Sequence, residues 1–167
     1  PFYPACSSLE ERSNSLSNLL QNHTDMSIPL ALPARGLIRQ FSGPNELIRG
    51  LICGFLRYAP EFELHIYGDD PRIHQLFPEA RVHTLPAKDR LTWDHFLFPM
   101  AIRKHGIAMA LFPKGPLPLF PPPRSVTFLL DLGYFYPALN AYRTLDTLYM
   151  QLGLHLAAPV SYTHLTL

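Results

Sequence analysis

The chain has 167 residues, 47% of them hydrophobic and 16% charged, which is the size of one compact domain and too short for two. Its 14 basic and 13 acidic side chains leave a net charge of +1, so no overall field favours nucleic acid, an anionic membrane or a polyacidic partner. Cys6 and Cys53 are too few for a disulfide framework or a closed zinc site. No apolar stretch reaches the roughly 18 residues of a membrane span and no signal-peptide pattern is present, which predicts a cytoplasmic domain.

The two ends of the chain differ in character from the middle. Residues 1–25 are rich in Ser and Asn and begin without methionine, whereas Met26 directly precedes an apolar run. We expect 1–25 to be a disordered leader or translated upstream sequence, with a genuine N-terminal arm as the alternative. Residues 160–167, VSYTHLTL, resemble a translated sequencing adaptor, with a genuine strand as the alternative. These interpretations assign the natural domain to residues 26–159.

The first predicted elements are a strand and an amphipathic helix. The apolar run 27–32 predicts a strand, in which Pro29 is tolerated only near the start because proline has no N–H for the sheet. Apolar residues spaced four apart over 46–58 predict the helix. Ser42-Gly43-Pro44-Asn45 introduces this helix with capping residues and a first-turn proline, and Pro60 ends it.

Two further strands and a second helix are predicted next. Apolar and polar residues alternate over 62–67 and a turn follows at 68–71, which predicts a half-buried strand. A short strand is predicted at 81–85. Residues 89–105 return to helical spacing, with a kink expected at Pro99 because proline interrupts the helical hydrogen bonds. Basic residues followed by Gly106 form a typical helix end, since glycine readily adopts the left-handed conformation.

The remaining elements complete an alternating order. Continuous apolar runs at 107–111 and 126–130 predict strands covered on both faces, and the apolar spacing over 142–156 predicts a last helix. The order of strands and helices predicts an α/β fold with an open, mainly parallel Rossmann-like sheet and flanking helices. Ligands of such sheets bind beyond the carboxyl ends of the strands. Here those ends are followed by loops at 33–45, 112–123 and 131–137.

Three places in these loops carry candidate site residues. Gly43, Pro44 and Asn45 precede a helix N-terminus, where free N–H groups can hold a phosphate or carboxylate, although a tight structural turn explains them as well. Lys114 and Gly115 follow a strand end and offer one cation, which as a lone loop lysine is often merely solvated.

Asp131 directly follows another predicted strand. Its carboxylate can accept hydrogen bonds from substrate hydroxyl groups or act as a base, and it is the candidate catalytic residue. Capping of the next turn is the alternative role.

Other chemistries leave no sequence signature. The eight histidines show no i,i+4 pair and no HExxH motif, so we expect no metal site. The phosphate-binding patterns GxGxxG and GxxxxGK[ST] and the nucleophile motif GxSxG are absent. Trp93, Phe96 and Phe98 lie at helical spacing and are expected to pack in a core or domain interface rather than stack on a sugar.

A resemblance to a known family rests on ordered blocks rather than on one motif. The blocks are a strand after Met26, SGPN at 42–45, the helix over 47–56, ELHIYG at 63–68, LTWDHF at 91–96, GIAMALFP at 106–113, GPLP at 115–118 and VTFLLDL at 126–132. Together they resemble the N-terminal domain of glycosyltransferase family 4, retaining enzymes of GT-B fold that use nucleotide sugars.

The chain departs from that family's pattern at two positions. Leu130 stands where members often have a histidine before the aspartate, and Pro44 follows Gly43 where the family usually has a second glycine. The Glu-x7-Glu domain that mainly binds the nucleotide sugar in the family does not occur within these 167 residues.

The resemblance implies a glycosyltransferase of hexosyltransferase type, active in polysaccharide or glycoconjugate assembly. The whole enzyme would move a sugar from a nucleotide-sugar donor to a glycan or lipid-linked acceptor, without an essential metal or other cofactor. This domain would supply acceptor contacts and part of the diphosphate cradle, with Gly43 and Asn45 facing the ligand and Lys114 and Asp131 on the rim. Alone, the chain is expected to be inactive because the C-terminal domain is missing.

Two further expectations concern partners. Peripheral contact with the inner face of the membrane is expected through the apolar loop of Phe112, Leu117, Leu119 and Phe120, with packing against the missing domain as the alternative. No nucleic-acid partner is expected.

The competing functional class is a non-catalytic α/β ligand-binding or regulatory module, flavodoxin-like or response-regulator-like. Residues 33–36, PARG, lack the acidic cluster of a response regulator.

Overall fold

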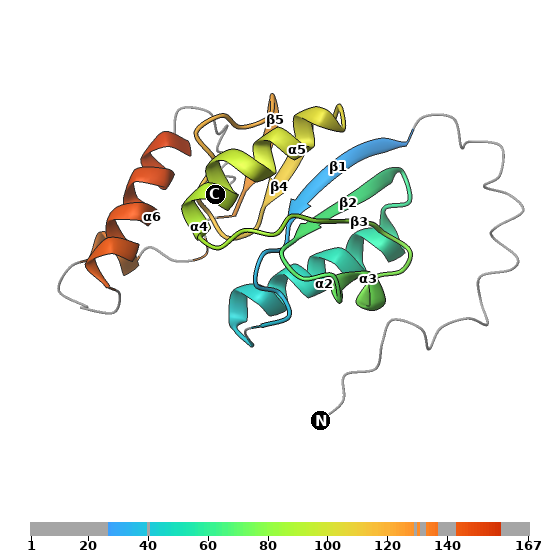
Figure 1. Cartoon of the computed structure of the whole chain (residues 1–167), viewed down its shortest axis with the longest axis horizontal. Coiled ribbons are helices and arrows are strands. Elements are labelled where there is room, and N and C mark those ends of the chain that lie inside the picture. Colours follow the sequence, from blue (N-terminus) through green and yellow to red (C-terminus); the bar gives the residue numbers. More distant parts are fainter. Residues whose placement is uncertain (1–26, 40, 129, 131–132, 137–142, 158–167) are drawn as a thin grey trace, which may run out of the picture.

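A computed structural model describes residues 27–39, 41–128, 130, 133–136 and 143–157. Its centre is a five-stranded, all-parallel sheet in the order β3-β2-β1-β4-β5 (Figure 1). The strands are β1 (Ile28–Pro33), β2 (Phe62–Gly68), β3 (Arg81–Thr84), β4 (Met109–Phe112) and β5 (Arg124–Thr127). The predicted α/β class with an open parallel sheet is therefore confirmed.

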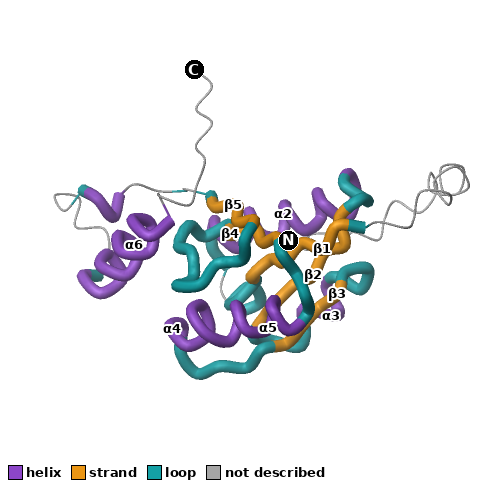
Figure 2. Tube along the Cα trace, turned by 90° about the horizontal axis from the view of Figure 1, so that it is seen from above, coloured by secondary structure: helices purple, strands orange, loops and turns teal. Residues whose placement is uncertain are grey.

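Helices cover both faces of the sheet (Figures 1 and 2). On one face lie α2 (Gly43–Tyr58) and the short α3 (Ile73–Leu76), and on the other lie α4 (Arg90–Thr92), a π-helical segment (Trp93–Leu97) and α5 (Phe98–Lys104). We call these the α2 face and the α5 face. A short 3-10 helix, Gly133–Phe135, precedes α6 (Thr144–Ala157), which lies outside the two layers, next to α4.

The predicted helix over 89–105 exists but contains a π-helical segment. The Phe98 N–H donates to the Trp93 carbonyl, five residues earlier, and this wider turn ends just before Pro99. Proline has no N–H for the usual bond to the preceding turn, so the helix changes its pattern there. The end of α5 agrees with the prediction, since Gly106 has φ +68° and the Ile107 N–H bonds back to Ile102 O at 3.0 Å.

The extent of pairing between neighbouring strands explains where β1 and β5 agree with or differ from the predicted strands. Pro29 pairs only towards β2, because the registered pairing of β1 with β4 begins at Leu30; a proline near the start of a central strand is thus tolerated. β5 spans Arg124–Thr127 rather than 126–130, because its pairing follows β4 from Met109 to Phe112. Val126 is 53% exposed at this sheet edge.

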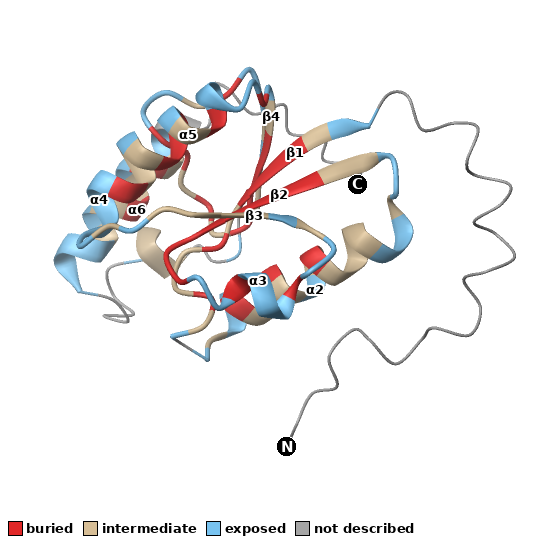
Figure 3. Cartoon of the chain, turned by 45° about the vertical axis from the view of Figure 1, so that its right-hand side comes forward, coloured by how far each residue is buried: buried red, intermediate tan, exposed pale blue. Residues whose placement is uncertain are grey.

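The two faces bury different kinds of side chain. Along β2, Leu64 and Ile66 point to the α2 face, where they meet Ile48 and Ile52 of α2. The alternate residue Tyr67 points to the α5 face and packs in the cluster that holds Trp93, Phe98 and Phe112. Figure 3 shows the buried residues concentrated along the central strands and the inner sides of the helices. Among the described residues no helix is long and apolar enough to cross a membrane.

Candidate functional site

A cavity of about 760 Å³ lies at the carboxyl edge of the sheet. Its walls come from the loops after β1, β2, β4 and β5, from the helical segment after β3 and from α6. The lining residues include Pro33, Arg35, Arg39, Pro44, Asp69, Arg90, Trp93, Asp94, Phe98, Phe112, Lys114, Gly115, Tyr134 and Met150. This volume is typical of a site for a small organic ligand.

The cavity coincides with the topological switch point of the sheet. From β1 the chain proceeds to β2 on one side, and after β3 it crosses to β4 on the other side of β1. Open α/β sheets bind ligands in the crevice that opens where the strand order reverses. Arg35 follows the end of β1 and Lys114 follows the end of β4, so a cation lies on each side of that crevice.

The lining carries a net positive charge. Arg35, Arg39, Arg90 and Lys114 face Asp69 and Asp94, so four basic groups less two carboxylates leave +2. Arg39 lies 3.8 Å from Asp69, and Arg90 bonds Asp94 at 3.2 Å. Arg35 and Lys114 have no carboxylate within ion-pairing distance among the described residues. These two side chains therefore supply the excess charge.

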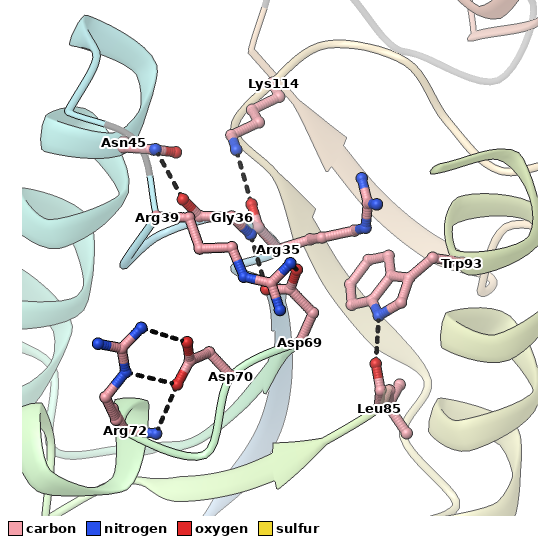
Figure 4. Close-up of polar contacts among 10 residues, drawn as sticks. All are labelled: Arg35, Gly36, Arg39, Asn45, Asp69, Asp70, Arg72, Leu85, Trp93 and Lys114. Carbon is pink, nitrogen blue, oxygen red and sulfur yellow. Dashed lines mark hydrogen bonds and ion pairs between the residues drawn. The ribbon is translucent and has the colours of Figure 1, made fainter. Parts of the chain in front are cut away.

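Arg35 and Lys114 are linked by a hydrogen bond (Figure 4). The Lys114 ammonium donates to the Arg35 carbonyl oxygen at 3.0 Å. Burial, together with the positive charge of Arg90, lowers the pKa of Lys114 to about 8. The Arg35 Nε atom is buried and has no hydrogen-bond partner among the described residues. Both groups would gain from an anion in the cavity.

Buried polar side chains hold the β1–α2 loop in place. The Gly36 N–H donates to Asp69 Oδ1 at 2.9 Å, and the Asn45 amide donates to the Gly36 carbonyl at 3.1 Å (Figure 4). Gly36 has φ +72°, a conformation that glycine adopts without steric cost. Arg49 of α2 adds a bond to the Leu37 carbonyl at 2.9 Å. The backbone next to Arg35 is thus held from two sides, by the turn after β2 and by α2.

The turn after β2 has a second acid with a different role. The Arg72 side chain bonds Asp70 at 2.7 Å, and these hydrogen bonds lower the pKa of Asp70 to about 2. Asp70 also accepts from the Arg72 backbone N–H at 3.0 Å. Asp70 therefore stabilises the predicted turn, whereas its neighbour Asp69 faces the cavity.

The structure places the sequence-predicted site residues in three ways. Pro44, Lys114 and Gly115 line the cavity. Gly43 is exposed and is not a lining residue, and Asn45 is only 1% exposed and holds the Gly36 carbonyl. Asp131 lies outside the described residues. The structure adds Arg35, Arg39 and Arg90, of which the first two occur in the predicted loop 33–45 and could have been found there.

The predicted packing of the aromatic residues is confirmed for Trp93 and Phe98, each 1% exposed. The Trp93 indole donates to the Leu85 carbonyl at 3.0 Å (Figure 4), while Phe96 is 53% exposed. The apolar loop expected at a membrane is divided, because Phe112 and Leu117 are buried and only Leu119 and Phe120 are exposed.

A second polar cluster escaped sequence reasoning. His65 of β2, His83 of β3 and His105 after α5 each offer a ring nitrogen, and these atoms lie within 4.8 Å of one another. Burial lowers the pKa of His65, and it lowers that of His83 to about 4. The three residues are 18 and 22 positions apart in the sequence, so no local spacing indicates the cluster. None of them lines the cavity.

Searches against protein-family models, curated proteins and solved structures found no match to this chain.

Proposed function

We propose that the chain is the N-terminal, acceptor-side domain of a retaining glycosyltransferase that uses a nucleotide sugar. In this proposal the cavity binds part of the diphosphate together with the acceptor, which is a glycan or a lipid-linked glycan. The observation that carries the proposal is the pair Arg35 and Lys114, which places unneutralised positive charge on both sides of the switch point. The family resemblance of the sequence blocks supports it independently.

The charge of the cavity suits a nucleoside diphosphate. As the glycosidic bond to the donor breaks, negative charge develops on the diphosphate, and fixed cations stabilise that charge. Arg35 offers a planar guanidinium and Lys114 an ammonium, and the N-terminus of α2 approaches the same cavity through Ser42 and Pro44. These groups can neutralise the leaving diphosphate without a metal ion, as the proposal requires.

The apolar part of the lining suits the acceptor side. Phe98, Phe112 and Met150 line the cavity together with the charged groups, and apolar surroundings strengthen an electrostatic contact. In this proposal Asp131 accepts hydrogen bonds from acceptor hydroxyl groups, and Leu119 and Phe120 contact a lipid-linked acceptor at the membrane surface.

Anion binding is tested first, on the 167-residue chain itself. Inorganic pyrophosphate and UDP are titrated calorimetrically into the unmodified chain and into the Arg35→Gln and Lys114→Gln variants. We expect weak binding to the unmodified chain. The affinity should fall about tenfold in each variant, because each variant loses one charge-assisted hydrogen bond to the anion. Lys104→Gln removes an exposed lysine at the end of α5 and should leave the affinity unchanged. Equal affinities in all four proteins would contradict the proposed cradle.

The transferase proposal is tested by reading the gene sequence that follows Pro159 and then by assaying the longer protein. A reading frame that continues past Pro159 into a second α/β domain with Glu-x7-Glu would support the proposal, and sugar transfer by the longer protein is then assayed with and without chelator. A natural stop codon after Leu167 in a chain that still binds pyrophosphate would favour the ligand-binding module instead.

A further inference from the structure

We propose that His65, His83 and His105 form a binding site for a divalent transition-metal ion of the zinc type. The site lies on the α5 face and is separate from the cavity, so it goes beyond the proposed function and does not depend on it. Imidazole nitrogen is a preferred ligand of Zn²⁺, Co²⁺, Ni²⁺ and Cu²⁺, and three histidines with an open fourth position form a familiar zinc site.

The register of the sheet creates the site. Side chains at alternate positions of a strand share a face, so His65 and Tyr67 of β2 both point to the α5 face. Tyr67 pairs with His83 of β3, which brings His83 to the same face. The end of α5 then adds His105, whose ring centroid lies 4.3 Å from that of His83.

The distances are close to those of a bound ion. His65 Nδ1 and His83 Nε2 lie 3.0 Å apart, and two nitrogens on one tetrahedral zinc at 2.0–2.1 Å lie about 3.3 Å apart. All three ligand nitrogens fall within 4.8 Å. His105 is exposed and follows the end of its helix, so a small rotation of its side chain closes the remaining gap.

Two neighbouring groups orient the rings. Glu63 Oε1 lies 3.3 Å from His65 Nε2. When Nε2 carries the ring proton and directs it at this carboxylate, the lone pair of His65 Nδ1 is directed at the cluster. Tyr67 Oη lies 2.7 Å from His105 Nδ1; when this nitrogen carries the proton, Nε2 is free to bind the ion. Carboxylate and hydroxyl partners of this kind commonly fix the tautomer of metal-binding histidines.

The surroundings leave the site accessible. His65 is 8% exposed, His83 is half-buried and His105 is exposed, so an ion reaches the cluster from the α5 side. Glu63 and Arg81 act on His65 and pair with each other, so the guanidinium charge is balanced beside the site.

The test uses the full chain without a histidine tag, stripped of metal by a chelator. Co²⁺ is titrated while its visible d–d absorption is recorded, and Zn²⁺ is then added as a competitor. We expect one equivalent of Co²⁺ with a tetrahedral spectrum, displacement by Zn²⁺, and a rise in the melting temperature with Zn²⁺, since an ion that binds only the folded state stabilises it.

Four variants, one of them a control, make the test specific. His83→Gln and His105→Gln should both lose the Co²⁺ spectrum, and Glu63→Gln should weaken binding about tenfold. His74→Gln changes an exposed histidine of α3 and should bind Co²⁺ normally. The His105 substitution is at the surface, so far-UV circular dichroism should show an intact fold.

Retention of the Co²⁺ spectrum by either folded ligand variant would overturn the proposal, as would the absence of any Co²⁺ spectrum in the unmodified chain. Pyrophosphate affinity measured on His105→Gln should equal that of the unmodified chain, which separates this site from the cavity.

Discussion

The two faces of the same sheet differ in the chemistry that they bury. The α2 face is aliphatic, with Leu30, Leu32, Leu64 and Ile66 against the helix. The α5 face is aromatic and polar, with Tyr67 between the His83 ring at 4.6 Å and the Phe98 ring at 5.3 Å. The two sets alternate along β2, so adjacent residues of one strand serve different purposes.

The two kinds of buried side chain contribute differently to stability and to ligand binding. Aliphatic burial is non-directional and stabilises in proportion to the apolar area removed from water. Tyr67 and the histidines carry polar atoms that must keep partners when buried, and the groups that satisfy this need are also the groups that can bind ions. We therefore expect truncations on the α2 face to change mainly stability, and substitutions of the cavity cations and of the α5-face histidines to change mainly binding.

The largest effect is expected from Ile66→Ala on the α2 face. Ile66 is fully buried, so the substitution loses apolar contacts and leaves a cavity, at a cost of about 2–5 kcal/mol in the free energy of unfolding. Urea denaturation measures it, with Val126→Ala at an exposed position as the control, expected to change by less than about 0.5 kcal/mol. Similar values for both variants would mean that this face is not the stabilising core.

Asn45→Ala tests the buried amide at the start of α2. The substitution leaves the Gly36 carbonyl without its donor, so we expect a loss of about 1–3 kcal/mol. Glu46→Ala, at the next residue, removes only a half-exposed ion pair with Arg49 and should stay within about 0.5 kcal/mol. An unchanged stability together with lost pyrophosphate affinity would show instead that Asn45 meets the ligand.

The pH dependence of anion binding tests the role of Lys114 at the carboxyl edge of the sheet. Its pKa is about 8, so the ammonium is protonated at pH 7 and loses its charge as the pH rises through 8. Pyrophosphate affinity should therefore fall on going from pH 7 to pH 9, by at most about tenfold or 1.4 kcal/mol. Calorimetry at both pH values measures this, and Lys114→Arg should remove the fall in affinity, because its guanidinium stays charged at pH 9. A rise in affinity with pH would contradict the assignment.

The smallest effect is expected from Tyr67→Phe on the α5 face. The ring stays packed while the hydrogen bond to His105 at 2.7 Å is lost, so stability should fall by only about 1 kcal/mol. The same variant should weaken Co²⁺ binding, because the His105 ring is no longer oriented. A loss as large as that of Ile66→Ala would remove the distinction between the two faces.

Much of the fold could be predicted because its signals are local. The four-residue spacing over 46–58, the alternation over 62–67 and Gly106 each reflect geometry within one element, and the structure confirms a helix, a strand and a helix end there. The sequence predicts a kink at Pro99, and the structure has a π-helical segment, Trp93–Leu97, just before it, a form that the sequence pattern does not indicate.

The site could be predicted only as far as chain order allows. A parallel sheet brings strand ends together at one edge, so the order of the strands predicts that the loops carrying Arg35 and Lys114 lie close together. The Asn45 side chain can turn to a ligand or to the Gly36 carbonyl. The choice depends on how α2 packs on the sheet, and the local sequence of α2 does not indicate this packing.

The sequence by itself determined the class of fold and the edge of the sheet at which the cavity lies, because periodicity and strand order are properties of the chain. Only the tertiary structure decided that His65, His83 and His105 meet. Their meeting requires the register that sets Tyr67 beside His83 and the placement of α5 above it. Both follow from long-range packing of helices on the sheet, which no spacing within the sequence records.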